Sequence, residues 1–161
     1  MKNLKVILAL LGFSLTSSFQ LAFALNGPPK LFIDKGACPF ECCTYREWTV
    51  EKDTELYDSI DGKKIIGIAK KGSQIRGITG EVHTVPLEIK DNDGNKIYLL
   101  TYQGEGVWKV WDNGAVKTSV GQNWDGDPRP KSTWWVQVKL STGIIGWTNK
   151  TGNFGNMDAC G

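Results

Sequence analysis

Apolar and polar residues alternate over short runs along most of the chain, and no run beyond the N-terminus has a helical period. The alternation is clearest in residues 135–140, where Val136, Val138 and Leu140 share one face and Trp135 lies on the other. Runs with strand character are residues 65–68, 74–79, 97–102, 107–111, 134–140 and 144–148. Glycine-bearing turns separate them, as hairpins require, at Asp61-Gly62, Lys71-Gly72, Asp93-Gly94, Asn113-Gly114 and Thr142-Gly143. This spacing predicts an all-β barrel or sandwich.

The N-terminal 24 residues have a different pattern. Lys2 and Lys5 precede an apolar stretch over residues 6–15, and Ala22-Phe23-Ala24 has the small-x-small form that signal peptidase accepts. The stretch is short for a bilayer span, although an uncleaved membrane anchor is the alternative. Because the first cysteine, Cys38, lies well beyond the cleavage point, a lipoprotein is not expected. We therefore predict a signal peptide over residues 1–24 and a mature chain that is periplasmic or secreted and is not inserted in a membrane.

Removing this segment changes the charge balance. The whole chain of 161 residues has 19 basic and 17 acidic side chains, and the segment contains two lysines and no acid. The mature chain is therefore close to neutral. Since nucleic-acid binding depends on a basic excess, we do not expect nucleic acid as a partner.

All four cysteines lie in the mature part, which in an exported chain predicts disulfides. Cys160 is expected to join the N-terminal cluster of Cys38, Cys42 and Cys43, and the second bond to join Cys38 to one of its two neighbours, because adjacent cysteines would form a strained ring. A zinc site is the alternative, but the only histidine, His83, is distant in sequence. We expect no metal and no cofactor.

Residues 135–147 resemble the closing hairpin of bacterial SH3-like domains. That hairpin has a tryptophan, a valine three residues later, a glycine-containing turn and a Gly-Trp pair. Here these are Trp135, Val138, Gly143 and Gly146-Trp147. Leu56-Tyr57, residues 65–67 and residues 70–75 resemble the opening strands, and residues 38–48 resemble the N-terminal segment of small exported SH3-like proteins of uncharacterised function. The resemblance implies an extended lead-in over 25–43 and an SH3-like β domain over 44–161.

The middle of the chain departs from that family. Nearly sixty residues separate the Lys70-Lys71-Gly72 turn from the closing hairpin, and within them residues 107–111 followed by Asn113-Gly114 predict a further hairpin. Either one barrel contains an inserted hairpin, or two small barrels, with sub-units 54–92 and 96–150, are partly fused.

Motifs for catalysis are not found in the sequence. It has no Gly-x-Ser-x-Gly elbow, no His-Glu-x-x-His and no phosphate loop, and His83 is interpreted as a surface or edge-strand residue. Asp91-Asn92-Asp93-Gly94 and Asp125-Gly126-Asp127 are interpreted as turns in preference to calcium loops, because glycine and glutamate are not at the positions that a calcium loop requires. We therefore expect a protein that is not an enzyme.

Seven tryptophans are many for a chain of this size, and core filling would explain several of them. The resemblance implies an aromatic groove for extended peptides or cell-wall stems, lined by Tyr57 and Trp135, with Trp111, Trp124 and Trp134 as further candidates. The alternative is that other parts of the molecule cover these rings. We predict an exported binding module that recognises a peptide or a peptidoglycan component. The competing hypothesis is a disulfide-stapled inhibitor or partner of another exported protein, acting through a loop over residues 121–131.

Overall fold

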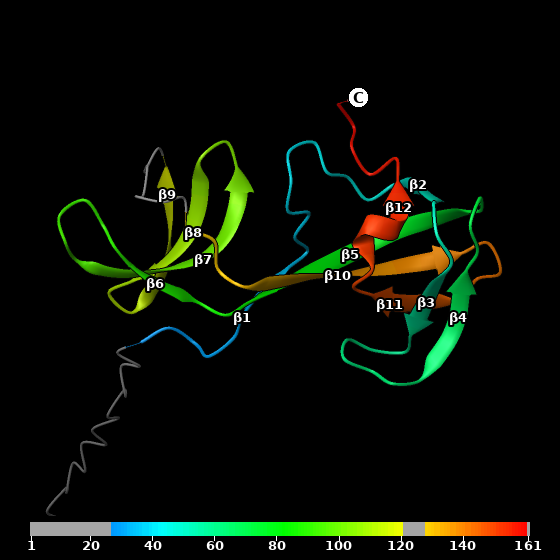
Figure 1. Cartoon of the computed structure of the whole chain (residues 1–161), viewed down its shortest axis with the longest axis horizontal. Coiled ribbons are helices and arrows are strands. Elements are labelled where there is room, and N and C mark those ends of the chain that lie inside the picture. The colour runs from blue at the N-terminus through cyan, green and yellow to red at the C-terminus, as the bar shows by residue number, and fades with distance from the viewer. Residues whose placement is uncertain (1–26, 121–127, 161) are drawn as a thin grey trace, which may run out of the picture.

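The computed structural model describes residues 27–120 and 128–160, and in these residues every regular element except one short 3-10 helix is a β-strand. The predicted all-β class is confirmed. The larger of two sheets has eight strands in the order β12-β2-β5-β10-β11-β3-β4, with β1 also pairing with β5, and it curls into a half-barrel (Figure 1). Its strands are β1 (Phe32–Lys35), β2 (Glu47–Val50), β3 (Thr54–Tyr57), β4 (Ile65–Ala69), β5 (Gln74–Thr84), β10 (Ser132–Leu140), β11 (Ile145–Thr148) and β12 (Phe154–Gly155).

The inner face of the curled sheet holds the main hydrophobic core. Val136 and Val138 are fully buried there, as their alternation along β10 predicts, and Leu140 packs against the same cluster. Trp48 on β2 is completely buried at the centre, and its indole Nε1 donates to the Thr44 carbonyl over 2.9 Å. The cluster consists of Trp48, Val50, Leu56, Ala69, Ile75, Val136, Val138 and Phe154.

A second sheet of four antiparallel strands is inserted between β5 and β10. Its strands are β6 (Leu87–Lys90), β7 (Lys96–Gly104), β8 (Val107–Asp112) and β9 (Ala115–Val120). Asn113 and Gly114 both have positive φ, so the predicted hairpin at this position is confirmed. The sheet has its own small core of Ile97, Leu99, Trp108 and Val110.

The two sheets do not coincide with the expected sub-units 54–92 and 96–150. β6 belongs to the inserted sheet, whereas β10 and β11 pair with β5 and β3 of the larger one. Strands β5 and β10 are long and pair from Ser132↔Thr84 to Leu140↔Ile75, so they extend from the main core toward the inserted sheet (Figure 1). The buried carboxylate of Asp34 on β1 accepts from Lys109 Nζ on β8 at 2.7 and 2.8 Å and links the two sheets.

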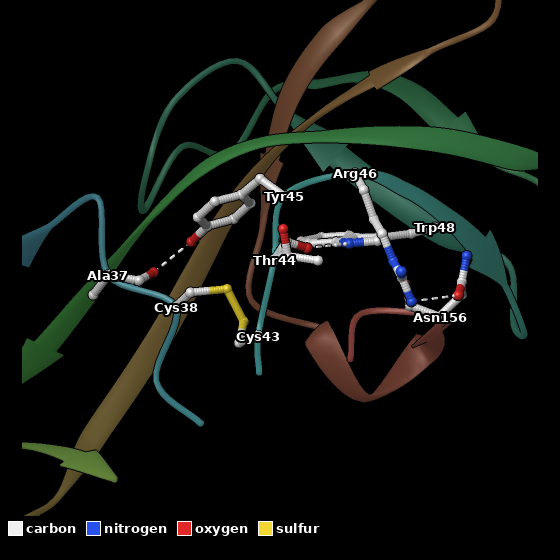
Figure 2. The surroundings of a disulfide bond; sticks show 8 residues. All are labelled: Ala37, Cys38, Cys43, Thr44, Tyr45, Arg46, Trp48 and Asn156. Carbon is white, nitrogen blue, oxygen red and sulfur yellow. Dashed lines mark hydrogen bonds between the residues drawn. A yellow bond between two sulfur atoms is a disulfide. The ribbon is translucent and has the colours of Figure 1, made fainter. Parts of the chain in front are cut away.

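Of the two disulfides, one is local to the N-terminal cysteine cluster and the other joins this cluster to the C-terminal segment. Cys38 bonds to Cys43, and Cys42 bonds to Cys160 across 118 residues, which confirms that Cys160 joins the N-terminal cluster. Arg46 reinforces this closure, because its guanidinium donates to the Asn156 carbonyl and, over 2.7 Å, to the Asn156 side chain (Figure 2). Figure 2 also shows the Tyr45 hydroxyl donating to the Ala37 carbonyl beside the Cys38–Cys43 bond.

Several predicted features fall outside the described residues. These are the signal peptide over residues 1–24, Trp124, the Asp125-Gly126-Asp127 turn and most of the 121–131 loop. In the part that is described, no helix has the length and apolar character needed to cross a membrane.

Candidate functional site

Tyr57 lies on the outer face of the larger sheet, opposite the core. On β3 its neighbour Leu56 points into the core, so alternation directs Tyr57 outward. The register places Trp147 of β11 directly across from Tyr57, and Gln137 of β10 across from Trp147. Trp135, two residues before Gln137, shares this face and lies diagonal to Trp147. An aromatic row of Tyr57, Trp147 and Trp135 therefore crosses three neighbouring strands.

A cavity of about 330 Å³ opens beside Tyr57. Strands β3 and β4 and the residues that flank them provide most of its wall, and Lys150 and Asn153 in the segment after β11 provide the rest. Asn153 belongs to the 3-10 helix Thr151–Asn153. Asn153 is fixed by a 2.9 Å hydrogen bond from its side-chain nitrogen to Thr54 Oγ1, which itself donates to the Lys52 carbonyl. The lining residues are Asp53, Thr54, Glu55, Tyr57, Ile68, Lys70, Lys150 and Asn153.

Charges of both signs surround the cavity. Lys70 Nζ lies 2.8 Å from Asp53 Oδ2, and the pKa of Asp53 is lowered mainly by this hydrogen bond and next by one from the Lys71 backbone N–H. The Tyr57 hydroxyl donates to Glu55 Oε2 over 2.8 Å, and this bond raises the phenol pKa above its ordinary value. Tyr57 is thus a neutral donor at physiological pH. The site offers cations, carboxylates and an aromatic ring within one concave surface.

The predicted ligand-binding residues do not form one groove. Trp135 is only 7 % exposed, which corrects the expectation that its ring lines an open groove; for this residue the alternative of a covered ring holds. Trp111 lies on β8 of the inserted sheet, opposite Tyr98 and Val116, and does not line the cavity beside Tyr57. Trp134 packs against the main core. Of the four aromatic candidates that the structure describes, Tyr57 is the one beside this cavity.

His83 lies on an interior strand, since β5 pairs with both β1 and β10, and this corrects its interpretation as an edge-strand residue. Its Nε2 lies 2.9 Å from Glu81 Oε2, and both side chains are largely buried. All four cysteines are in disulfides, so none offers a thiolate to a metal. The Asp91 carboxylate accepts the backbone N–H groups of Asp93 and Asn95, which is the hydrogen bonding of a turn.

Of the residues that line the cavity, the sequence interpretation identified Tyr57 alone and missed the others, among them the charged residues Asp53, Glu55, Lys70 and Lys150. It also missed Trp147 in the aromatic row. Trp147 had a usable signal, because alternation from Gly146 sends it to the same face as Tyr57 once β11 pairs with β3. Lys150 and Asn153 had no such signal in the sequence, because they lie in the segment after β11, where strand alternation does not apply.

Comparison with protein-family models, with curated proteins and with solved structures finds no match. We therefore derive the function from the geometry of this chain.

Proposed function

We propose that this protein is an exported, non-catalytic module that binds a peptide or the peptide stem of peptidoglycan in the cavity beside Tyr57. The observation that carries the proposal is the combination of Lys70, Lys150, Asp53 and Glu55 around one aromatic side chain. A short peptide carries an amino group and a carboxylate, and a stem peptide carries carboxylates together with the side-chain amino group of its diamino acid. A mixed-charge cavity complements such a ligand better than a cavity of one sign does.

The ion pair at the site can exchange partners at low cost. Lys70 and Asp53 have side chains 67 % and 54 % exposed, and exposed ion pairs contribute little net free energy. A ligand carboxylate can therefore bind Lys70 and Lys150 while Asp53 and Glu55 receive the ligand's amino group. The cavity volume lies at the lower end of the range for small-molecule and peptide sites.

The export and SH3-like parts of the proposal have separate support. The two disulfides are typical of proteins that fold in an oxidising compartment, in agreement with a signal peptide at residues 1–24. The Trp135, Val138 and Gly146-Trp147 motif lies in the paired strands β10 and β11, as it would in a closing SH3-like hairpin. We infer an SH3-like half-barrel with the four-stranded sheet as an insertion.

Co-sedimentation with purified peptidoglycan sacculi tests the binding role. We expect the wild-type protein to pellet with sacculi and Tyr57→Ala to remain largely in the supernatant, because the variant removes the aromatic wall and its bond to Glu55. Tyr98→Ala is the matched control, since Tyr98 is a partly exposed tyrosine in the inserted sheet, away from the cavity. Equal retention of wild type and Tyr57→Ala, or no retention of either, would overturn the proposal.

A further inference from the structure

Strand β4 forms one end of the larger sheet. Among the described strands it pairs with β3 alone, and it lies at the rim of the half-barrel (Figure 1). The strand at the other end of the sheet order, β12, has two residues, whereas β4 has five. An unpaired strand edge presents a row of backbone N–H and C=O groups with which another strand can pair. Of the two end strands, β4 therefore offers the longer edge.

Exposed isoleucines lie on both faces of this edge. Ile65 and Ile68 pair with outward-facing residues of β3, so they share the outer face, and they are 47 % and 44 % exposed. On the inner face, an added Cβ at Gly67 would lie 3.2 Å from the side chain of Ile144, which is 36 % exposed. Because side chains alternate along a strand, an added strand would cover Ile65 and Ile68 with one set of side chains and Ile144 with the other.

Lysines flank the strand at both ends. Lys63 and Lys64 precede β4, Lys70 and Lys71 follow it, and residues 62–72 contain no acidic side chain. All four lysines are exposed. Lys70 pairs with Asp53, whereas the other three form no ion pair within the part of the chain that the structure describes. The edge is therefore apolar in its middle and positively charged at its ends.

This charge pattern discriminates between occupants of the edge. If two copies of β4 paired in antiparallel fashion about Gly67, the lysines before the strand in one copy would lie opposite those after it in the other. Like charges directly opposite each other destabilise a strand pair, so the pattern disfavours a second copy of this chain. A segment with carboxylates at its ends would instead meet opposite charges at both ends.

We propose that β4 is the docking edge for an extended segment of a partner protein, which adds to the sheet as a further strand. The segment has apolar side chains at alternate positions and carboxylates at both ends. Its backbone pairs with β4, its apolar side chains contact Ile65 and Ile68, and its carboxylates face the lysines. The proposal does not rest on the cavity beside Tyr57, because Ile65, Lys63 and Lys64 do not line that cavity.

The probe is a synthetic peptide blocked at both ends, Asp-Glu-Val-Thr-Val-Thr-Val-Glu-Asp, and its matched control is Lys-Lys-Val-Thr-Val-Thr-Val-Lys-Lys. In ¹⁵N NMR titrations of the oxidised protein, we expect the acidic peptide to shift the β4 amides saturably. The lysine-ended peptide should bind at least about tenfold more weakly, because its ends meet like charges.

Reversing the charge before β4 tests the role of the lysines. The double variant Lys63→Glu and Lys64→Glu should bind the acidic peptide about tenfold more weakly than wild type and should bind the lysine-ended peptide more tightly. Lys35→Glu together with Lys90→Glu is the control, since it changes the net charge equally at exposed lysines of β1 and β6. This control variant should keep the wild-type preference.

Removing apolar surface from the edge tests the contact with the segment. Ile65→Ser should weaken binding of the acidic peptide by about tenfold, whereas Val116→Ser, at a similarly exposed position of β9, should not. Tyr57→Ala should also leave this binding unchanged, because β4 separates an added strand from β3. This result distinguishes failure at the edge from failure at the cavity.

Several results would overturn the proposal. These are β4 amides that do not shift with the acidic peptide, equal affinity for the two peptides, or unchanged affinity in the double lysine variant. Loss of binding in Tyr57→Ala would assign the peptide to the cavity instead. Concentration-dependent shifts of β4 amides in the protein alone would identify a second copy as the occupant, and would also overturn it.

Discussion

At the scale of single residues, the cavity beside Tyr57 depends on how Asp53 is held. Its carboxylate accepts from Lys70 Nζ and from the Lys71 backbone N–H, each over 2.8 Å. These bonds favour the ionised form, which is why the pKa of Asp53 is lowered. At pH values above the unfolded-state pKa of about 3.9, the two bonds make their full contribution to the free energy of unfolding. That contribution is lost as the pH falls through the lower pKa of the folded state.

We predict that Lys70→Ala raises the pKa of Asp53 toward its ordinary value, measured by carboxyl-carbon NMR titration. The reason is that the side-chain hydrogen bond of Lys70 is the largest cause of the lowered pKa. Lys71→Ala is the control, because Lys71 binds Asp53 through its backbone N–H, which the substitution preserves. An Asp53 pKa that is the same in wild type and Lys70→Ala would contradict this account of the site.

Residue identity alone could predict only part of this site. Tyr57 was identified from a motif resemblance, and the structure places it beside a cavity. Trp135 was expected to be open because alternation sends it away from the core, yet it is 7 % exposed. Alternation predicts the face of a sheet on which a side chain lies, but it does not predict whether another part of the chain covers that face.

At the scale of elements, β5 shows how a glycine allows close packing. An added Cβ at Gly77 would lie 2.7 and 2.8 Å from atoms of the Trp48 ring, which is fully buried and has no room to move. Glycine within a strand often marks such a close approach.

Gly77→Ala is predicted to destabilise the protein by about 1–3 kcal/mol, the usual cost of overpacking a core. Urea unfolding followed by tryptophan fluorescence measures the loss. Gly152→Ala is the matched control, since an added Cβ there meets nothing within 4 Å. A similar loss in both variants would contradict this account, because contact with Trp48 would then not set the requirement at Gly77.

The strands themselves were largely predictable, and their partners were not. Runs with one buried face, such as β8 and β10, showed β-branched and aromatic alternation. β9 is exposed along almost its whole length, so its residues carry no alternating pattern of their own. The bulge at Leu100 and the pairing of β10 with β5 across the insertion depend on contacts between residues distant in sequence, which a local pattern does not encode.

At the scale of the whole molecule, the Cys42–Cys160 bond joins the C-terminal segment to the N-terminal cysteine cluster. It spans 118 residues, compared with 5 for Cys38–Cys43. The Arg46 bonds to Asn156 and the Thr44 N–H bond to the Met157 carbonyl lie beside it, so the C-terminal segment is held at several points.

In the chain-entropy model, removing the long-range bond with Cys42→Ser and Cys160→Ser should cost about 5 kcal/mol, and removing the local bond with Cys38→Ser and Cys43→Ser about 2 kcal/mol. The difference arises because a longer loop restricts the unfolded chain more. Guanidinium unfolding of the two paired-serine variants measures it. Equal losses, or a larger loss from the local bond, would contradict the assigned role of the Cys42–Cys160 closure.

The central claim is that a peptide binds beside Tyr57, and ¹⁵N NMR titration with a synthetic peptidoglycan stem tetrapeptide tests it most directly. We predict saturable shifts concentrated on β3, Ile68, Lys70, Lys150 and Asn153, with Tyr57→Ala abolishing them and Tyr98→Ala leaving them unchanged. The account would be contradicted by spectra that do not change with peptide, or by saturable shifts confined to the inserted sheet of β6 to β9.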